Sequence, residues 1–504
     1  MHWFELPASS NEPAPAFEDV RGATAWLAAQ PQAQPLHMLG ALGAQVRAID
    51  AAAWPAAQTL AVLDVLRHSI VTLVVAVDSR FLRKSLPMQA EDQRVFENTR
   101  QLLTWQGVAY LRLSAHLPPG DKLVPLHRAA IALRQAQFCH FQAAQDMSPL
   151  LDRLLFGILA QAESAGVLRQ PIRDPEFPEF AESNIAGHVA WAFLLRLIDP
   201  YHLSGAQLTV TNRAFSRWRE LAGFQSTPDD DPKARAVPLD QIFGDALPDG
   251  LPRWLDVRAV ARKMRRRVES LNAGESPESL KLGRELSAAA CIRLFHDLDE
   301  QLGRRLGTPA TEVGEVELLF GAEHAYALFA GKPLQVQTMT DKSKAISNQR
   351  MALFGFDRVS QLPNAVKKLN LPSETWQLVD GQAVRSPTVQ LRRQSPCLIA
   401  SLRDAGPRLG VLGGLRARAD GSLAARLRWY PWRIEACSLV GGTGGRQPAF
   451  LLHEDEGLAL LVSPAAGLRL NAELALEEAS VAAVVPFEVL ERGADFVRYA
   501  CAAV

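Results

Sequence analysis

The hydrophobic pattern of this chain changes near residue 375, and the change limits the folds that the chain can adopt. From about residue 17 to 225, and again beyond residue 253, apolar side chains recur every three or four residues, which is the period of amphipathic helices. From Thr375 onward, short and partly alternating apolar runs are separated by glycine or proline, which is typical of antiparallel strands in a small barrel or sandwich. The sequence therefore predicts an α+β protein with a large all-helical N-terminal region followed by a small antiparallel β-barrel.

The length of the chain and one break in its pattern indicate how these parts are divided. A chain of 504 residues is too long for one hydrophobic core, because single cores stop growing at roughly 250–300 residues. Segment 226–252 concentrates proline, aspartate and glycine, so it breaks any helix and marks the clearest loop or domain seam. The expected parts are a helical domain over 1–225, a second helical segment over 253–330 that packs on the first, a connector over 331–374 and a barrel domain over 375–504.

Two local patterns refine the helical part. Ser148 and Pro149 are predicted to be the cap and the first residue of one helix, because serine satisfies a free amide there and proline lacks one. A further short helix is expected around Val313 to Phe329.

Charge and cysteine content exclude several classes of protein. Lys plus Arg and Asp plus Glu each number 54, so the chain lacks the overall positive field of a general nucleic-acid binder, and we expect no DNA or RNA partner. The five cysteines are far apart and never in a C-x-x-C spacing, which predicts buried thiols in a reducing compartment rather than a disulfide framework or a zinc ribbon. We therefore expect no metal and no cofactor.

Neither export nor membrane insertion is expected from the apolar segments. The first residues, MHWFELPASSNEP, carry acids and prolines where a signal peptide has a basic stretch and an apolar run. The most apolar run, Ile70 to Val77, is far shorter than the roughly 20 residues needed to cross a bilayer. The sequence predicts a cytoplasmic protein without a membrane span.

Three stretches of the chain carry a resemblance to a known family. They are DVLRHSIVTLVVAVDSRFLRKSLPMQAEDQ, the region from MRRRVESLNAGESPESLKLG to VELLFGAEHAYALFAGKPL, and LGVLGGLRARADGSLAARLRWYPWRIEACSLVGG. They resemble a proteobacterial family of cyclic di-GMP receptors linked to surface attachment and to pilus or motility regulation. The resemblance implies a helical N-terminal region, a C-terminal PilZ-like barrel, cyclic di-GMP as the ligand and no enzymatic activity.

The PilZ resemblance also implies where a ligand would be held. In that family an Arg-x-x-x-Arg stretch before the first strand and an Asp/Asn-x-Ser-x-x-Gly strand bind the dinucleotide, because guanidinium forks grip phosphate oxygens and guanine edges. Here Lys367 and Lys368 stand at the first position, and Asp380, Gln382 and Arg385 fall on the second, so only the acid is retained. The barrel is expected either to bind cyclic di-GMP or, as a degenerate form, to bind a protein partner.

The segment from Arg385 to Arg433 is strongly basic, with ten arginines against two acidic residues. It forms either an anion-binding face or the solvated faces of ordinary strands. The aromatic residues Trp429, Tyr430 and Trp432 either stack on guanine or belong to the core. The residues predicted to hold the ligand are Lys367, Lys368, Asp380, Arg385, Arg392, Arg393, Arg428 and Trp429.

A second basic cluster precedes the barrel. Arg262, Arg265 and Arg266 share one face of a predicted helix, and Lys263 and Arg267 flank them. This face either holds a phosphate or an acidic partner, or is simply solvated.

Motifs of catalysis are missing from the sequence. His296, Asp297 and Asp299 are metal-binding types of side chain, but a site needs three or four converging ligands, and no second His-rich helix is present. The Gly-rich stretches at 410–414 and 440–445 lack the Lys-Ser/Thr of a P-loop, and no Gly-x-Ser-x-Gly elbow occurs. We expect no enzymatic activity.

Two functions of different classes remain open. The first is a cyclic di-GMP receptor or effector that acts in surface attachment or motility signalling, with a protein partner bound through the helical region. The second is a protein-binding scaffold whose degenerate PilZ-like barrel does not bind nucleotide.

Overall fold

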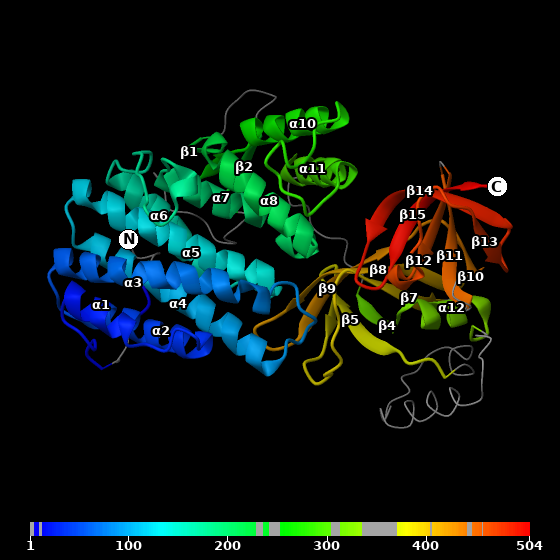
Figure 1. Ribbon diagram of the computed structural model, residues 1–504, viewed down its shortest axis with the longest axis horizontal. Coiled ribbons are helices and arrows are strands. Elements are labelled where there is room, and N and C mark those ends of the chain that lie inside the picture. Colours follow the sequence, from blue (N-terminus) through cyan, green and yellow to red (C-terminus); the bar gives the residue numbers. More distant parts are fainter. Residues whose placement is uncertain are drawn as a thin grey trace. The chain divides into compact units, whose positions relative to one another are not determined.

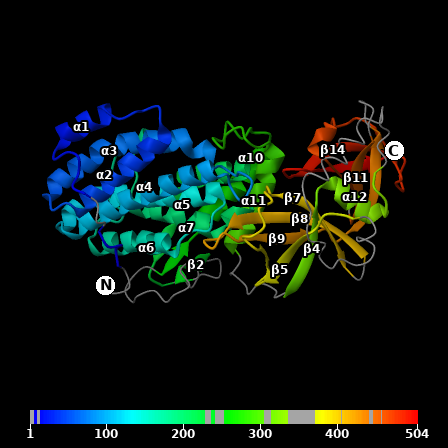
Figure 2. The same ribbon diagram turned by 90° about the horizontal axis from the view of Figure 1, so that it is seen from below.

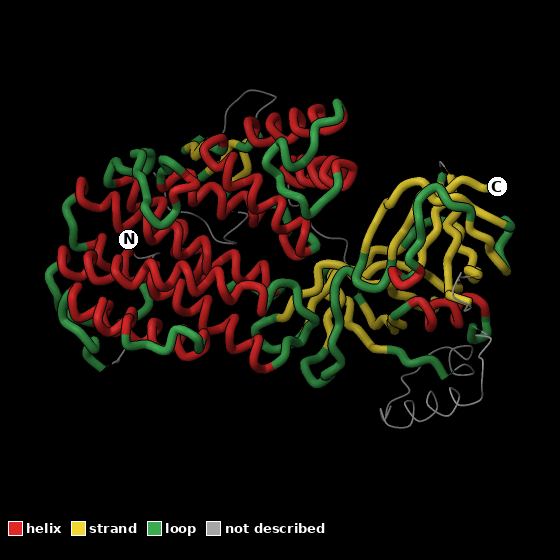
Figure 3. The backbone as a smooth tube through the Cα atoms, in the orientation of Figure 1, coloured by secondary structure: helices red, strands yellow, loops and turns green. Residues whose placement is uncertain are grey.

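The computed structural model describes residues 5–9, 13–227, 235–240, 253–303, 313–334, 370–403, 406–440, 446–455 and 457–504. The chain divides into two compact units, one made of residues 1–84 and 88–308 and the other of residues 85–87 and 309–504. Figure 3 shows that helices dominate the first unit and strands the second. The predicted α+β class, with its helical N-terminal region, is therefore confirmed.

The helical unit is built around the long helices α4 and α5. In Figures 1 and 2, α4 and α5 lie side by side, with α2 and α3 packed against α4 and with α6 and α7 packed against α5. The bounds of the described helices are α1 Val20–Ala28, α2 Pro35–Ala51, α3 Ala56–Val77, α4 Ala90–Ala115, α5 Leu123–Ala143, α6 Pro149–Ser164, α7 Ile185–Leu197, α8 Gly205–Trp218, α10 Arg258–Asn272 and α11 Ala288–Gly303. Short 3₁₀ turns connect them at η1 Asp78–Arg80, η2 Pro119–Lys122, η3 Pro178–Phe180, η4 Pro200–His202 and η5 Arg219–Leu221.

Polar side chains set the beginnings of several of these helices. Ser148 caps α6 by accepting from the amide of Leu150, and Pro149 is its first residue, as the sequence predicts. Asn184 caps α7 by accepting from the amide of Gly187. Ser204 and Gln207 form a reciprocal capping box at the start of α8. These caps fix where α7 and α8 begin.

A small sheet interrupts the helical unit, so its description as all-helical needs correction. Strands β1 Gly223–Gln225, β2 Ala236–Pro238 and β3 Trp254–Asp256 pair antiparallel in the order β1-β3-β2. Strands β1 and β3 flank the predicted seam at 226–252 and β2 lies within it, yet that segment does not separate the two units, because residues on both sides share one hydrophobic core. The pairing of β1 with β3 therefore holds together the residues before and after this proline- and glycine-rich segment.

The first barrel of the second unit begins earlier than the sequence predicts. Its strands are β4 Gly314–Phe320, β5 Glu374–Val379, β6 Gln382–Arg385, β7 Cys397–Arg403, β8 Gly406–Ala417 and β9 Leu423–Trp429, closed in the order β4-β5-β6-β9-β8-β7. The helix expected around Val313 to Phe329 is therefore wrong in its first half. Glu315 and Glu317 alternate with the buried Val316 and Leu318 in β4, and helix α12 follows only at Ala322–Ala330.

A second closed barrel follows where one barrel was predicted over 375–504. Its strands are β10 Arg433–Val440, β11 Arg446–Glu454, β12 Gly457–Val462, β13 Leu474–Glu477, β14 Ala483–Arg492 and β15 Val497–Ala503, closed in the order β10-β11-β12-β15-β14-β13, with a short turn η6 at Pro464–Ala466. Helix α12 contacts β7 of the first barrel and β11 of the second. Both barrels therefore contribute to one shared core around that helix.

Two expectations about the chain as a whole can be compared with the fold. All five cysteines are free and buried, which confirms the prediction of buried thiols. Among the described residues one helical stretch, Ala56–Arg80, is long and apolar enough to cross a membrane by length and composition, although 33% of its most apolar part is buried. Core helices of soluble proteins meet the same criterion, so this stretch by itself is weak evidence of a span.

Candidate functional site

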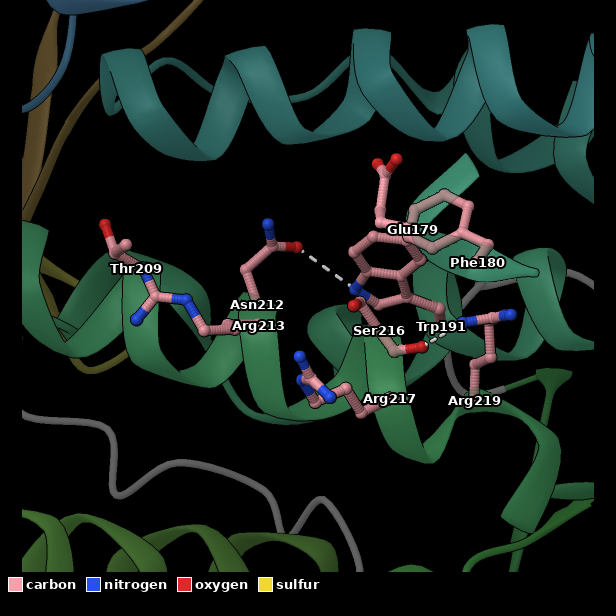
Figure 4. Close-up of a pocket in the computed structure, with 9 residues that line it drawn as sticks. All are labelled: Glu179, Phe180, Trp191, Thr209, Asn212, Arg213, Ser216, Arg217 and Arg219. Carbon is pink, nitrogen blue, oxygen red and sulfur yellow. Dashed lines mark hydrogen bonds between the residues drawn. The ribbon is translucent and has the colours of Figure 1, made fainter. Parts of the chain in front are cut away.

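A cavity of about 370 Å³ opens in the helical unit beside the face of α8. Its lining combines arginine, aromatic and small polar side chains (Figure 4). The lining residues are Glu179, Phe180, Trp191, Thr209, Asn212, Arg213, Ser216, Arg217 and Arg219. We call this cavity the α8 pocket.

Helix α8 supplies one wall of the pocket because its polar side chains repeat at helical spacing. Thr209, Asn212, Arg213 and Ser216 are three or four residues apart, so they lie along the same side of the helix. The opposite side of α8 carries buried apolar residues such as Phe215, which anchor the helix in the core. The capping box at its start and this apolar face hold the polar side toward the cavity.

The aromatic wall comes from α7 and from the turn η3. Trp191 of α7 donates from its indole Nε1 to Asn212 Oδ1 at 3.0 Å, which fixes the plane of the ring (Figure 4). Phe180 of η3 meets Trp191 edge to face, with ring centroids 6.0 Å apart and planes at 89°. Aromatic faces of this kind stack on the planar rings of bound ligands.

Buried cations lie behind these aromatic rings. The guanidinium of Arg134 from α5 stacks 3.6 Å from the centroid of Trp191, and that of Arg219 lies 4.8 Å from the centroid of Phe180. Burial lowers the pKa of Arg134 to about 9 and also lowers the pKa of Arg219, which Glu220 and Glu179 partly offset. Within the described part of the chain, no carboxylate lies within ion-pair distance of Arg134, and its Nε has no hydrogen-bond partner. Arg134 therefore contributes a positive charge that no described carboxylate pairs with, whereas the Nε of Arg219 lies 3.4 Å from Glu220 Oε1.

The polar groups deeper in this wall do not supply a compensating charge. Burial lowers the pKa of His127 to about 4 and the pKa of His188 well below its usual range, so both rings are neutral near pH 7. Both donate to or accept from Ser183 Oγ, at 2.8 and 3.2 Å. The carboxylate of Asp174 is held by Arg67. These groups therefore leave the positive charge of Arg134 uncompensated, so it can attract an anionic ligand in the pocket.

Two further arginines line the mouth of the pocket. Arg217 is exposed and forms no ion pair with any described residue. Arg213 is held by Glu285 through two hydrogen bonds of 2.8 and 2.6 Å. Guanidinium forks beside aromatic faces suit a ligand that carries both a phosphate and a planar base.

The residues that the sequence singled out in the barrel are not gathered into one site. Lys367 and Lys368 lie outside the described residues. Asp380 is exposed in the turn between β5 and β6, with φ 50°. Arg392 is exposed and donates from Nε to the carbonyl of Pro87, 3.2 Å away in the same unit. Arg385 and Arg393 are brought together, but around the buried carboxylate of Glu374, which pairs with both.

The remaining barrel candidates lie on and beside β9. Arg428 pairs with Glu491, while Trp429 stacks under the guanidinium of Arg408, whose carbon lies 4.9 Å from a ring centroid of Trp429. Tyr430, which was expected either to stack on guanine or to join the core, is buried in the core of the second unit. The guanidinium groups of Arg385, Arg393 and Arg428 therefore already have carboxylate partners.

The other candidates from the sequence are engaged in ordinary contacts. Asp299 accepts from Arg235 and lies 3.7 Å from Arg265 of the basic helix face. In the part of the chain that the structure describes, no three His, Cys, Asp or Glu side chains converge as ligands for a metal ion. The exposed Arg262 and Arg266 project from α10, whose other face packs in the core through Val260, Met264 and Val268.

Sequence reasoning missed the α8 pocket, although part of its signal was visible. Arg213 and Arg217 stand four residues apart on the polar side of a capped helix. Such spacing is common on solvated helix faces, so it carries meaning only once Trp191 and Arg134 are known to lie beside it.

Comparison with known proteins points to the same part of the chain. Residues 21–230 match the model of a family described as "Cyclic-di-GMP receptor FimW, N-terminal domain". No curated protein and no solved structure matches the chain. The matched residues contain every residue that lines the α8 pocket. The resemblance to a family of cyclic di-GMP receptors is thereby confirmed for residues 21–230, which are similar to the N-terminal domain of that family.

Proposed function

We propose that this chain is a cyclic di-GMP receptor that takes a guanine nucleotide unit of its ligand into the α8 pocket. The observation that carries the proposal is the convergence of Arg213, Arg217 and Arg219 with two aromatic rings around one cavity. The cavity lies within residues that match a domain of a cyclic di-GMP receptor. The description of that family supplies the ligand, and the chemistry of the lining fits it.

Each part of the ligand has a counterpart in the lining. The anionic phosphate is attracted by Arg217 at the open side and by the buried Arg134 behind Trp191. The purine stacks on Trp191 or Phe180, whose faces are polarised by the cations behind them. Asn212 and Ser216 present hydrogen-bonding groups to the edge of a base.

The size of the pocket limits how much of the ligand enters. A cavity of about 370 Å³ is at the lower end of the roughly 300–1,000 Å³ that encloses most of a drug-sized ligand. Cyclic di-GMP consists of two guanosine monophosphate units. We therefore assign one unit to the pocket and leave the other at its mouth.

The proposed receptor acts by a shift in population rather than by catalysis. Ligand in the pocket stabilises one arrangement of α7, α8 and the turn η3, and a protein partner then recognises that arrangement. We place this action in the cytoplasm, where cyclic di-GMP would regulate surface attachment or motility. The support for this role is the family that residues 21–230 match.

Calorimetry with cyclic di-GMP tests the proposal on the full chain. The wild-type protein is expected to bind, and Arg217→Ala to bind roughly tenfold more weakly, because a charge-assisted hydrogen bond contributes about 1.4 kcal/mol or more. Arg262→Ala, at another exposed arginine, on α10, is the matched control and should leave the affinity unchanged. The absence of both binding heat and thermal stabilisation at high ligand excess would overturn the proposal.

A second candidate function is favoured by the state of the barrel arginines. Arg385, Arg393 and Arg428 are held by Glu374 and Glu491, which leaves no free fork at those positions for a nucleotide. The two barrels would then serve as a structural or protein-binding module. Capture of the same protein partner with and without cyclic di-GMP distinguishes such a scaffold from a receptor.

A further inference from the structure

An internal carboxylate already occupies one of the guanidinium groups that line the α8 pocket. Arg213 Nη1 donates to Glu285 Oε2 at 2.8 Å, and its Nη2 donates to Glu285 Oε1 at 2.6 Å. The same Nη1 also donates to the carbonyl of Leu282 at 2.5 Å. This two-pronged geometry is the one in which arginine binds either a carboxylate or a phosphate.

The backbone around Glu285 is shaped to approach this guanidinium closely. Gly283 has φ +99°, and a Cβ added there would lie 1.7 Å from Arg213 Nη1 and 2.1 Å from Glu285 Oε2. Any other residue would therefore push the loop away from Arg213. Leu280 and Leu282 are buried, so they anchor the rest of the segment between α10 and α11. We call residues 274–287 the α10–α11 loop.

We propose that the fork of Arg213 is the phosphate-binding position of the α8 pocket, that Glu285 is its internal occupant, and that a ligand phosphate displaces Glu285 on binding. The proposal rests on the proposed function, because it assigns the part of that same site that holds the phosphate. A guanidinium edge that is bonded to two carboxylate oxygens cannot also bond to two phosphate oxygens. Binding at this position therefore requires the ion pair to open.

The ion pair between Arg213 and Glu285 is weak enough for a ligand anion to displace Glu285. Each partner side chain is 34% exposed, and partly exposed pairs of this kind are weak compared with buried ones. The hydrogen bond from Arg213 lowers the pKa of Glu285 to about 2, so a change of pH in the physiological range does not release it. A competing anion is then the natural trigger. Such an anion also gains contacts with Arg217 and Trp191 that Glu285 lacks.

Displacement of Glu285 has a consequence outside the pocket. The α10–α11 loop loses the ion pair and the bond from Arg213 to Leu282, while its apolar anchors remain. The loop connects α10 to α11, so binding of a ligand in the pocket alters the surface that these two helices form. Ligand binding thus becomes coupled to a segment that a partner protein can recognise.

The test compares Glu285→Gln with Glu278→Gln, a control in the same loop whose carboxylate pairs with Arg284 on the surface. Affinity for cyclic di-GMP is measured by calorimetry, and hydrogen exchange of residues 274–287 is measured with and without ligand. We expect Glu285→Gln to bind roughly fivefold more tightly, because a competing charge is removed, and Glu278→Gln to behave as wild type. Exchange in the loop should rise on ligand binding in wild type and be high already in ligand-free Glu285→Gln.

An unchanged affinity of Glu285→Gln, or loop exchange that does not respond to bound ligand, overturns the inference. Inorganic phosphate serves as a second probe that does not depend on the nucleotide. If the wild type fails to bind cyclic di-GMP, the proposed function falls. In that case inorganic phosphate is compared on two variants, Glu285→Gln and the double variant Glu285→Gln with Arg213→Ala. Stronger thermal stabilisation of the single variant supports the phosphate position at Arg213. Equal stabilisation of the two variants overturns it.

Discussion

The guanidinium of Arg134 stacks on the ring of Trp191 at 3.6 Å, on a residue that also lines the α8 pocket. Arg134 is 4% exposed and has no carboxylate partner among the described residues. Burying a cation without a counter-ion is costly, since the charge loses its hydration. Arg134 therefore lowers the stability of the ligand-free protein, and an anion bound in the pocket offsets part of this destabilisation.

Replacement of Arg134 should therefore change stability and affinity in opposite directions. Arg134→Met keeps an unbranched apolar stem against Trp191 and removes the buried charge, so we expect a higher Tm for the helical unit. Affinity for cyclic di-GMP should fall, because the positive field behind the ring is lost. Thermal unfolding and calorimetry on the same preparation check both effects.

The matched control for that variant is Arg100→Met. Arg100 also lies over an aromatic ring, that of Phe96 at 5.9 Å, but Phe96, unlike Trp191, does not line the pocket. Its loss should leave the affinity unchanged. A lower Tm with unchanged affinity for Arg134→Met would mean that the cation serves packing alone.

Glu374 should be the most sensitive acidic residue of the first barrel. Its buried carboxylate accepts from Arg385 Nη1 at 3.0 Å and pairs with Arg393 as well. Glu374→Ala leaves one fully buried and one partly buried guanidinium without a counter-ion, and breaking a buried pair typically costs about 3–5 kcal/mol.

Hydrogen exchange of β5 and β6 measures this loss locally, which avoids assuming that two units unfold together. Glu315→Ala on β4 is the control, because Glu315 is exposed and, among the described residues, accepts a side-chain hydrogen bond from Gln377 alone. Protection of β5 and β6 that is unaltered in Glu374→Ala would contradict the prediction.

Local patterns in the sequence were sufficient to predict many elements but not their partners. Ser148 and Pro149 mark the start of α6 because capping depends on neighbours within one turn. The sequence predicts helix where β4 lies, since a short run such as GEVELLF fits either period. It becomes a strand by pairing with β5, about 60 positions later in the chain at Val316 and Trp376. The same dependence on distant partners hid the division of the strands into two closed barrels.

The candidate site was hidden for a related reason. Arg134, Trp191 and Arg213 come from α5, α7 and α8, and each has an ordinary sequence context. The barrel arginines stood out because they are crowded in sequence, yet Glu374 and Glu491 neutralise several of them across strands. Density of charge along a chain does not predict free charge in a fold.

The buried His140 should make the helical unit sensitive to acid. Burial, and then the charge of Arg100, lowers the pKa of His140 to about 4, whereas an unfolded histidine titrates near 6.5. Between these values the unfolded chain binds a proton that the folded chain does not, so stability is present above about pH 6.5 and is lost as the pH falls toward 4. A pKa shift of this size corresponds to a loss of about 3 kcal/mol in the free energy of unfolding.

His140→Leu should remove this part of the pH dependence. Tm measured between pH 7 and pH 4 is expected to fall less in the variant than in wild type, because the carboxylates titrate alike in both. The same substitution at the exposed His37 is the control. Equal slopes for wild type and His140→Leu would exclude His140 as a source of acid sensitivity.

The two locations considered for the ligand predict opposite results for Arg428. Its guanidinium pairs with Glu491, which also accepts from Tyr430 Oη at 3.1 Å and lies 3.6 Å from Arg498 Nε. Arg428→Ala therefore leaves Glu491 with two partners and should cost the barrel little stability. Because the α8 pocket holds the ligand in our proposal, the variant should bind cyclic di-GMP as wild type does in calorimetry. Weaker binding by Arg428→Ala together with unaltered binding by Arg217→Ala would move the nucleotide site to the barrel, where the resemblance to PilZ domains first placed it.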